Sequence, residues 1–110
     1  MAFTAYHNIT GSTGVSIELI APGSDVGEIQ SIMIANTHAT ADATVSLFIQ
    51  DEPTAAATKT FYILSTVAIP SDTSLLLDNS TVLSFDNSSN GYGLYLTVGS
   101  SDTLDVMINR

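Results

Sequence analysis

Alternation of apolar and polar residues with a period of two is the feature that most constrains this chain. It is clear in the stretch SIMIANTHATADATVSLFIQD, residues 31–51, where Ile32 and Ile34 share one face of a short run. Successive side chains of a β-strand point to opposite faces, so such a run predicts a strand with one face in the core and one in solvent or against a neighbour. The same pattern recurs at 43–51, 61–68, 94–98 and 104–109.

Turn-forming residues separate the apolar runs at intervals of roughly 8–15 residues, the spacing of an all-β sandwich or barrel. The turns are APGSDVG, IPSDTS, DNSSNG (a hairpin-type connection) and GSSD. The segment 51–59 has some helical character, but it is too short to be stable alone, and we expect a loop or a single turn there. The strands that we expect lie near 3–9, 15–21, 28–36, 43–51, 59–68, 74–78, 81–86, 92–99 and 103–109.

These observations predict an all-β fold: a single antiparallel β-sandwich of the jelly-roll or immunoglobulin-like type, with about eight to nine short strands. A chain of 110 residues fits one domain, so we assign 1–110 to a single sandwich. Two interpretations stay open for residues 1–9. They form either an ordinary first strand or an N-terminal arm that extends to a neighbour, with Phe3, Tyr6 and Ile9 as its apolar contacts.

Charge excludes several classes of partner. The formal net charge is -9, and Lys59 and Arg110 are the only basic residues. Nucleic-acid binding needs cations that displace counterions from phosphates, so we expect no nucleic acid, and an anionic membrane surface is disfavoured for the same reason. The first residues lack a basic start and an apolar stretch, so we expect no signal peptide. With no cysteine, no disulfide or thiolate site is expected.

The expected surface is neutral more than ionic. Charged residues make up only 12 %, and serine and threonine together outnumber them. Threonine suits exposed strand positions and serine suits turns. Such a surface can pack against a partner with little desolvation of charge.

The segment DNSSNG matches the first half of a calcium-binding loop through Asp86, Ser88, Asn90 and Gly91. A complete loop needs a glutamate six positions after the glycine. That position is Thr97, inside an alternating run, so we expect a plain turn and no metal site.

The remaining polar candidates point away from catalysis. His7 and His38 lie in different segments without metal-ligand spacing, and His38 is expected to be exposed or to cap a turn. Asp51 and Glu52 are adjacent at a strand end, whereas glycosidases need two carboxyl groups facing each other across a cleft. We therefore expect a non-enzymatic protein with no catalytic residue, no cofactor and no metal.

Aromatic residues offer one binding alternative. Tyr62, Tyr92 and Tyr95, with Phe48, can form a platform for a sugar or a peptide, although aromatic residues in strands are more often half-buried cross-strand pairs. Tyr92 and Tyr95 join Phe3, Tyr6 and Ile9 as the residues that we expect to contact a partner.

Four stretches carry a resemblance: IQSIMIAN, ATVSLFIQD, KTFYILSTVAIPSDTSLLLD and GYGLYLTVGSSDTLDVMINR. Together they resemble small β-sandwich virion structural proteins of tailed bacteriophages, marine phages especially, over about residues 28–109. The resemblance implies a capsid decoration (cement) protein, or a neck, tail, baseplate or fibre subunit. Its motifs are structural and do not choose among those positions.

From the resemblance we expect a virion protein, made in the host cytoplasm, that binds the outer surface of the head and stabilises contacts between major capsid subunits. Its partner is then the major capsid protein or another virion protein, and a homo-oligomer, such as a trimer at threefold positions, is expected. A neck, tail, baseplate or fibre subunit is the first alternative. A carbohydrate- or receptor-binding module is the second.

Overall fold

Eight strands follow one another in the part of the chain that the structure describes. The structure, a computed structural model, describes residues 4–10, 14, 16–23, 29–51, 59–79, 83–88, 91–100 and 103–109. The strands are β1 (Thr4–Ile9), β2 (Ser16–Ile20), β3 (Ser31–Asn36), β4 (Ala43–Gln50), β5 (Thr60–Ile69), β6 (Thr73–Leu77), β7 (Gly93–Ser100) and β8 (Leu104–Asn109).

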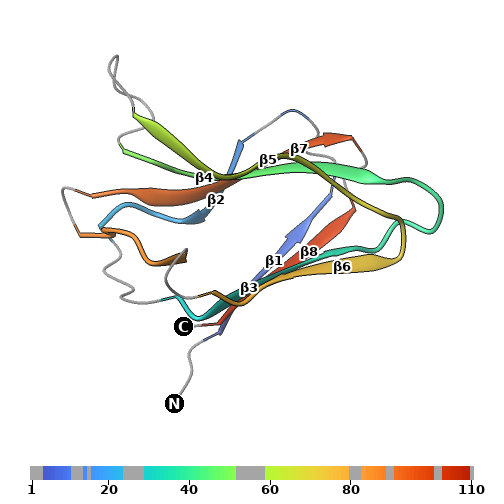
Figure 1. The fold of residues 1–110 in the computed structure, drawn as a ribbon, viewed down its shortest axis with the longest axis horizontal. Coiled ribbons are helices and arrows are strands. Elements are labelled where there is room, and N and C mark those ends of the chain that lie inside the picture. Colours follow the sequence, from blue (N-terminus) through green and yellow to red (C-terminus); the bar gives the residue numbers. More distant parts are fainter. Residues whose placement is uncertain are drawn as a thin grey trace.

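The strands form two four-stranded antiparallel sheets that lie face to face (Figure 1). Sheet A has the order β1-β8-β3-β6, and sheet B has the order β2-β7-β4-β5. Strand β1 therefore pairs with β8, β2 with β7, β3 with β6 and β4 with β5, as if a long hairpin had been rolled up. That order is the jelly roll, which decides between the two sandwich types expected from the sequence.

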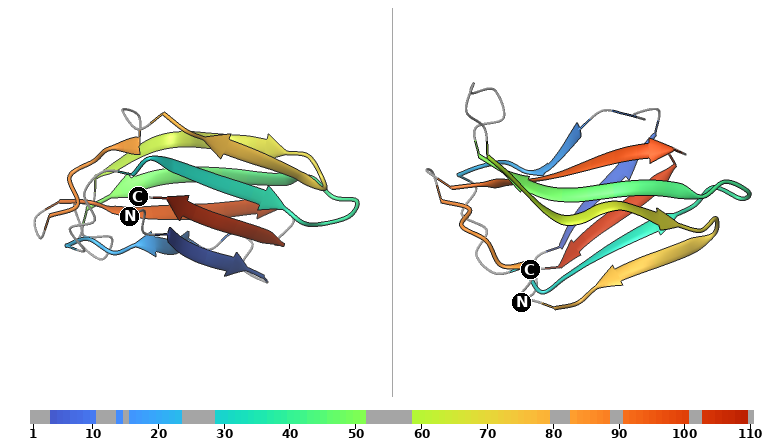
Figure 2. Two further views of the ribbon diagram at one scale, coloured as in Figure 1. Left: turned by 90° about the horizontal axis from the view of Figure 1, so that it is seen from below. Right: turned by 45° about the horizontal axis from the view of Figure 1, so that its top comes forward.

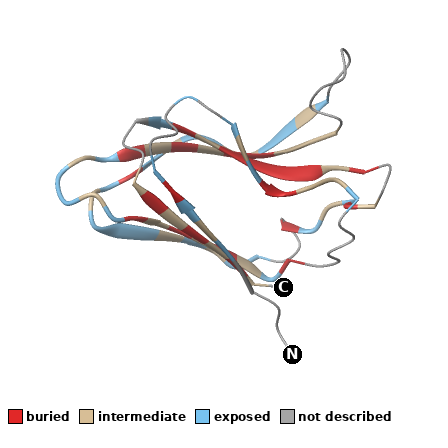
Figure 3. Ribbon diagram, turned by 180° about the vertical axis from the view of Figure 1, so that it is seen from behind, coloured by how far each residue is buried: buried red, intermediate tan, exposed pale blue. Residues whose placement is uncertain are grey.

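The alternation seen in the sequence produces the core. The inward residues of both sheets are buried, and buried and more exposed residues alternate along the strands (Figure 3). Each fully buried leucine, isoleucine or valine contributes about 1.5–3 kcal/mol to folding. The completely enclosed residues are Ile29, Ile32, Ile34, Ala43, Val45, Leu47, Leu94, Leu96, Val98, Val106 and Ile108.

The expected strand at 81–86 is wrong over its described part, 83–86. Leu83 is buried and Phe85 is packed against the core, so the alternation is real but belongs to a connecting segment. The Leu83 N–H donates locally to the carbonyl of Asn79 at 3.2 Å and not to a neighbouring strand. The DNSSNG turn therefore does not join two strands of a hairpin. The expected loop or turn at 51–59 lies outside the described residues, except for its two ends.

Residues 4–9 form β1 and pair with β8 along their whole length. Figure 2 shows β1 and β8 side by side at one edge of the sandwich. For these residues, the ordinary first strand is what the fold contains. Residues 1–3 lie outside the described part, so an extension by them stays a prediction.

Two buried asparagines connect the loops. The Asn36 amide donates to the carbonyls of Ala41 and Ile69 at 2.9 and 3.0 Å. The Asn87 amide donates to the carbonyls of Ala21 and Tyr92 at 3.0 and 2.7 Å. Buried polar groups must be paired, so these side chains fix the loops at their positions.

The edge strands of sheet B are irregular. Pairing of β5 with β4 shifts twice, between Val45 and Leu47 and between Leu47 and Phe48, and β5 also holds Thr66 at a φ of 53°. Pairing of β2 with β7 shifts once, between Glu18 and Ile20. Bulges of this kind twist an edge and hinder pairing with another chain. In sheet A, β6 pairs with β3 without any shift.

Candidate functional site

An apolar row crosses the outer face of sheet A from one edge to the other. Tyr6 pairs with Met107, Met107 with Met33, and Met33 with Leu76, one residue from each strand. The neighbours of Met33 and Met107 along their strands are buried, so these two side chains face outward. The ends of the row are open: Tyr6 is 71 % exposed and Leu76 is 57 % exposed. We call these four residues the sheet A row.

Three polar residues and one alanine follow the sheet A row on one side. The next set of outward positions pairs Asn8 with Asp105, Asp105 with Ala35 and Ala35 with Ser74. The Asn8 amide donates a hydrogen bond to the Asp105 carboxylate. A hollow of about 350 Å³ lies at this junction. Its lining residues are Tyr6, His7, Asn8, Ala35, Asp105, Val106 and Met107.

An equivalent row crosses the outer face of sheet B, and it is aromatic. Glu18 pairs with Tyr95, Tyr95 with Phe48, and Phe48 with Tyr62. The Phe48 ring stacks on Tyr95 with centroids 5.9 Å apart and lies tilted against Tyr62 at 5.3 Å. As a result Phe48 is only 4 % exposed and Tyr95 only 5 %, although both face outward from the sheet. We call these four residues the sheet B row.

The polar end of the sheet B row is a hydrogen bond. The Tyr95 hydroxyl donates to Glu18 Oε2 at 3.3 Å. Burial of the phenol, together with the negative charge of Glu18 and this hydrogen bond, raises the pKa of Tyr95 to about 12. Tyr95 is therefore a neutral hydrogen-bond donor that holds the row in place.

A second aromatic pair lies at the end of sheet B. Phe61 meets Tyr92 edge to face, with centroids 5.8 Å apart. Phe61 and its neighbour Tyr62 are both exposed, at 56 % and 59 %. These rings offer open faces that the buried centre of the sheet B row does not.

The five residues that we expect to contact a partner lie in different environments. Phe3 lies outside the described residues. Tyr6 is the most exposed of the large hydrophobic residues that the structure describes. Ile9 lies in the core, so its side chain does not reach the surface. Tyr92 is half-buried against Phe61, and Tyr95 is covered by its row. The partner contact of Tyr6 stays a prediction.

Sequence reasoning missed Met33, Met107 and Leu76. Met33 and Met107 lay at polar-side positions of alternating runs, and that was a signal that an apolar side chain faces outward; Leu76 lies among three consecutive leucines, where alternation gives no signal. What the sequence did not provide was the register that aligns them with Tyr6.

The polar candidates hold loops together. His38 Nδ1 accepts the N–H groups of Thr40 and Ala41 at 3.1 and 3.0 Å, so it caps a turn as expected. The Asp51 carboxylate accepts the Lys59 N–H at 2.6 Å, between the two ends of the 51–59 segment. His7 Nε2 is buried and has no hydrogen-bond partner among the described residues.

The DNSSNG segment has the bonds of a turn. The Ser88 N–H donates to the Asp86 carboxylate at 3.0 Å, and hydrogen bonds from the Ser88 side chain and backbone lower the pKa of Asp86. The Tyr92 N–H closes the loop on the Asp86 carbonyl at 2.6 Å. A Cβ on Gly91 would collide with that carbonyl, so glycine is required there. Within the described ranges, no group of three or more histidine, aspartate or glutamate residues could hold a metal ion.

No helix in the described part of the chain is long and apolar enough to cross a membrane. Comparisons with family models, with curated proteins and with solved structures found no match to this chain. The candidate functional site is therefore defined by its own geometry, as the two outer rows.

Proposed function

We propose that this chain is a non-enzymatic structural protein of a tailed-bacteriophage virion, and specifically a decoration protein that binds the outer surface of the head. In this role it bridges neighbouring major capsid subunits and adds many weak apolar and hydrogen-bonded contacts. The observation that carries the proposal is the sheet A row, an open apolar line across four strands with mostly uncharged neighbours.

The chemistry of the row fits protein–protein contact. Tyrosine and methionine are enriched at the centres of protein interfaces, where charged residues are depleted. The resemblance of residues 28–109 to phage virion proteins supports the same role. The jelly roll is compatible with it, since viral capsid domains use this fold, but lectin domains and cupins use it too, so the fold alone does not choose.

The experiment compares phage particles assembled with and without this chain. We expect hundreds of copies over the head surface, and we expect heads that lack the chain to release DNA at a lower temperature. Imaging of the particles and quantitative mass spectrometry measure location and copy number. A few tens of copies at the neck or tail would replace the head assignment with the alternative virion position, and no copies would refute both.

Variants connect this test to the site. Tyr6→Ser combined with Leu76→Ser should lower the occupancy of purified heads, because both exposed ends of the row are lost. Ser84→Ala, at an exposed position outside both rows, is the matched control. Equal occupancy for both variants would exclude the sheet A row as the attachment surface. Light scattering of the free protein tests the homo-oligomer, such as a trimer, that we expect from the sequence resemblance.

Carbohydrate or receptor binding is a second candidate, and the exposed Phe61 and Tyr62 rings favour it. Aromatic faces of this kind can stack on sugar rings. A glycan array probed with the wild-type chain and with Tyr62→Ser tests the idea, with Tyr6→Ser as control. Binding that is lost only in Tyr62→Ser would support it, and absence of binding by the wild type would exclude it for the glycans on the array.

A further inference from the structure

Strand β6 is an edge strand of sheet A that lacks the common devices against pairing with another chain. The edge strands of sheet B have shifted registers, and β1 carries His7 and Asn8 in its middle. Strand β6, with the sequence TSLLL, has no charge, no proline and no register shift against β3. Natural proteins block sheet edges with those devices, so their absence marks an edge that is able to pair.

The hydrogen-bond pattern identifies which backbone groups face this edge. The Thr37 N–H donates to the carbonyl of Thr103 at 3.1 Å and continues the β3–β8 ladder by one pair. Bonded and non-bonded pairs alternate along an antiparallel ladder, so odd-numbered residues of β3 bond to β8, and even-numbered ones bond to odd-numbered residues of β6. The backbone N–H and C=O groups of Ser74 and Leu76 therefore point toward the open edge.

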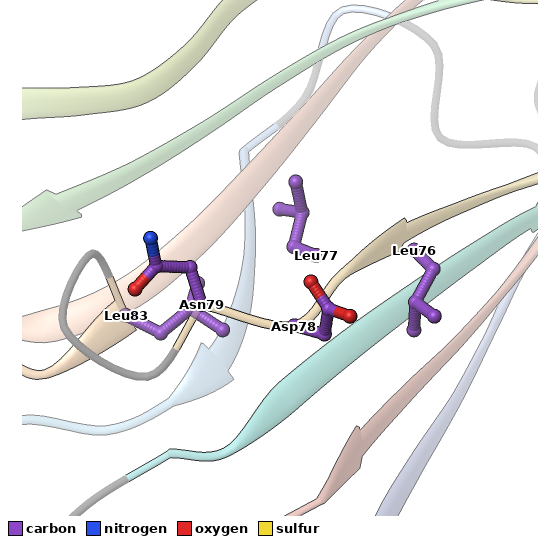
Figure 4. A pocket seen from close by; sticks show the side chains of 5 residues that line it. All are labelled: Leu76, Leu77, Asp78, Asn79 and Leu83. Atoms are coloured by element: carbon purple, nitrogen blue, oxygen red, sulfur yellow. The ribbon is translucent and has the colours of Figure 1, made fainter.

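Side chains beside the edge suit an added strand. Leu76 and Leu77 lie on opposite sides of β6, and Asp78 follows at its carboxyl end (Figure 4). Leu75 and Leu77 are only partly buried against the core, so apolar side chains of an added strand would cover them. A cavity of about 190 Å³ lies at this end, lined by Leu76, Leu77, Asp78, Asn79 and Leu83. Since one water occupies about 30 Å³ of liquid, the cavity has room for a side chain.

Two carboxylates define the charge of the occupant. Asp72 and Asp78 are exposed and flank β6 at its two ends, Asp72 in the turn before the strand, where its φ is 55°, and Asp78 directly after the strand. The outward residues between and beside them on sheet A are uncharged: Ser74, Leu76, Ala35 and Met33. A strand that pairs with β6 consequently meets an apolar centre with a negative charge at each end.

A second copy of this chain fits poorly. Two-fold antiparallel pairing that uses both edge residues of each copy sets Ser74 opposite Leu76 of the copy. That register also brings Asp72, in the turn before β6, near Asp78 of the copy at both ends. Like charges directly opposite each other destabilise a pair of strands, so charge disfavours self-pairing.

We propose that β6 receives an extended segment of a partner protein as a fifth strand of sheet A. The segment carries lysine or arginine at two positions six residues apart, which face Asp72 and Asp78, with alternating apolar and hydroxyl residues between them. Backbone bonds to Ser74 and Leu76 provide affinity, and the two charge pairs select the segment. This proposal goes beyond the proposed function, because it specifies the chemistry of the segment that binds β6, whichever protein supplies that segment.

The test uses a blocked seven-residue peptide with three valines alternating with two threonines between terminal lysines. The control peptide has glutamates in place of the lysines. Amide NMR titration of the ¹⁵N-labelled full chain measures binding. We expect the lysine peptide to shift the Ser74 and Leu76 amide signals and to bind roughly tenfold more tightly than the glutamate peptide. Failure of the lysine peptide to bind, or shifts confined to other strands, would overturn the proposal.

Two variants separate backbone pairing from charge. Ser74→Pro removes the edge N–H without touching the β3 ladder and should abolish binding, whereas Ser74→Ala keeps the N–H and should bind as the wild type does. Asp72→Asn with Asp78→Asn should bind both peptides equally, and asparagine tolerates the φ of 55° at position 72.

The double variant keeps the test decisive even where Ser74→Pro fails to fold. Unchanged discrimination between the two peptides in the double variant, or undiminished binding by a folded Ser74→Pro, would refute the proposed pairing. Ultracentrifugation of the double variant adds a second readout, since removal of the Asp72–Asp78 repulsion should increase self-association. The peptide result does not depend on the phage experiment, so the two proposals fail separately.

Discussion

The outer faces of the two sheets differ in how far their large side chains are buried. Each sheet carries one row of large side chains across its four strands. In sheet B the rings of Tyr95 and Tyr62 cover Phe48, so Phe48 and Tyr95 are almost wholly buried and only Tyr62, at one end, stays exposed. In sheet A, Tyr6 and Leu76 stay exposed at the two ends of the thioether pair. An outward-facing residue can therefore belong to the fold or to a binding surface, and its neighbours across the strands decide which.

The largest expected effect separates the centres of the two rows. Phe48→Ala should lower the free energy of unfolding by about 3–4 kcal/mol, because it removes a buried ring and both of its aromatic contacts. Met33→Ala, at the corresponding place in sheet A, should cost about 1 kcal/mol, since its side chain is only partly buried. Urea unfolding followed by circular dichroism measures both. Equal losses would mean that the sheet A row is also part of the fold.

A smaller effect concerns the polar end of the sheet B row. Tyr95→Phe should lower the free energy of unfolding by about 1 kcal/mol at neutral pH, because the hydrogen bond to Glu18 is lost.

The contribution of Tyr95 to the free energy of unfolding should decrease at high pH. The pKa of Tyr95 is raised above its ordinary value to about 12, so the native state favours the neutral phenol. The stabilisation is fully present below the ordinary pKa of about 10 and is lost as pH rises from there toward 12. Tyr95→Phe should therefore be less sensitive than the wild type in this window. Absorbance titration near 295 nm, compared between the two proteins, should show one late-titrating phenol in the wild type alone.

The smallest effect compares the exposed ends of the rows. Leu76→Thr should change the free energy of unfolding by no more than about 0.5 kcal/mol, since the side chain is exposed and threonine suits a strand. Tyr62→Thr should cost about 1 kcal/mol through its lost contact with Phe48. Thermal unfolding of the two variants in parallel checks the difference. A larger loss in Leu76→Thr would show that the open end of the sheet A row is structural after all.

The strands were predictable where a segment with alternating apolar and polar residues also pairs with a neighbouring strand. Residues 31–36 and 104–109 read as strands and are strands, because one face of each meets the core. Residues 83–86 show why the rule fails: Leu83 and Phe85 pack on the core from a segment whose backbone bonds locally. The rows were not predictable, because register depends on turn lengths and bulges and not on the pattern within one strand. Tyr95 and Tyr6 look alike in the sequence, and only their cross-strand neighbours distinguish them.

The position of the last two strands has a consequence for how the chain is made. Strand β8 lies between β1 and β3, and β7 lies between β2 and β4, so neither sheet has a continuous interior until both have been synthesised. Asn8 and Asp105, joined by a hydrogen bond, are 97 residues apart. Folding must therefore wait until β8 has been synthesised, and contacts of such long range make it slow compared with helical proteins of equal size. Until then, the apolar faces of the early strands are open to chaperones and to one another.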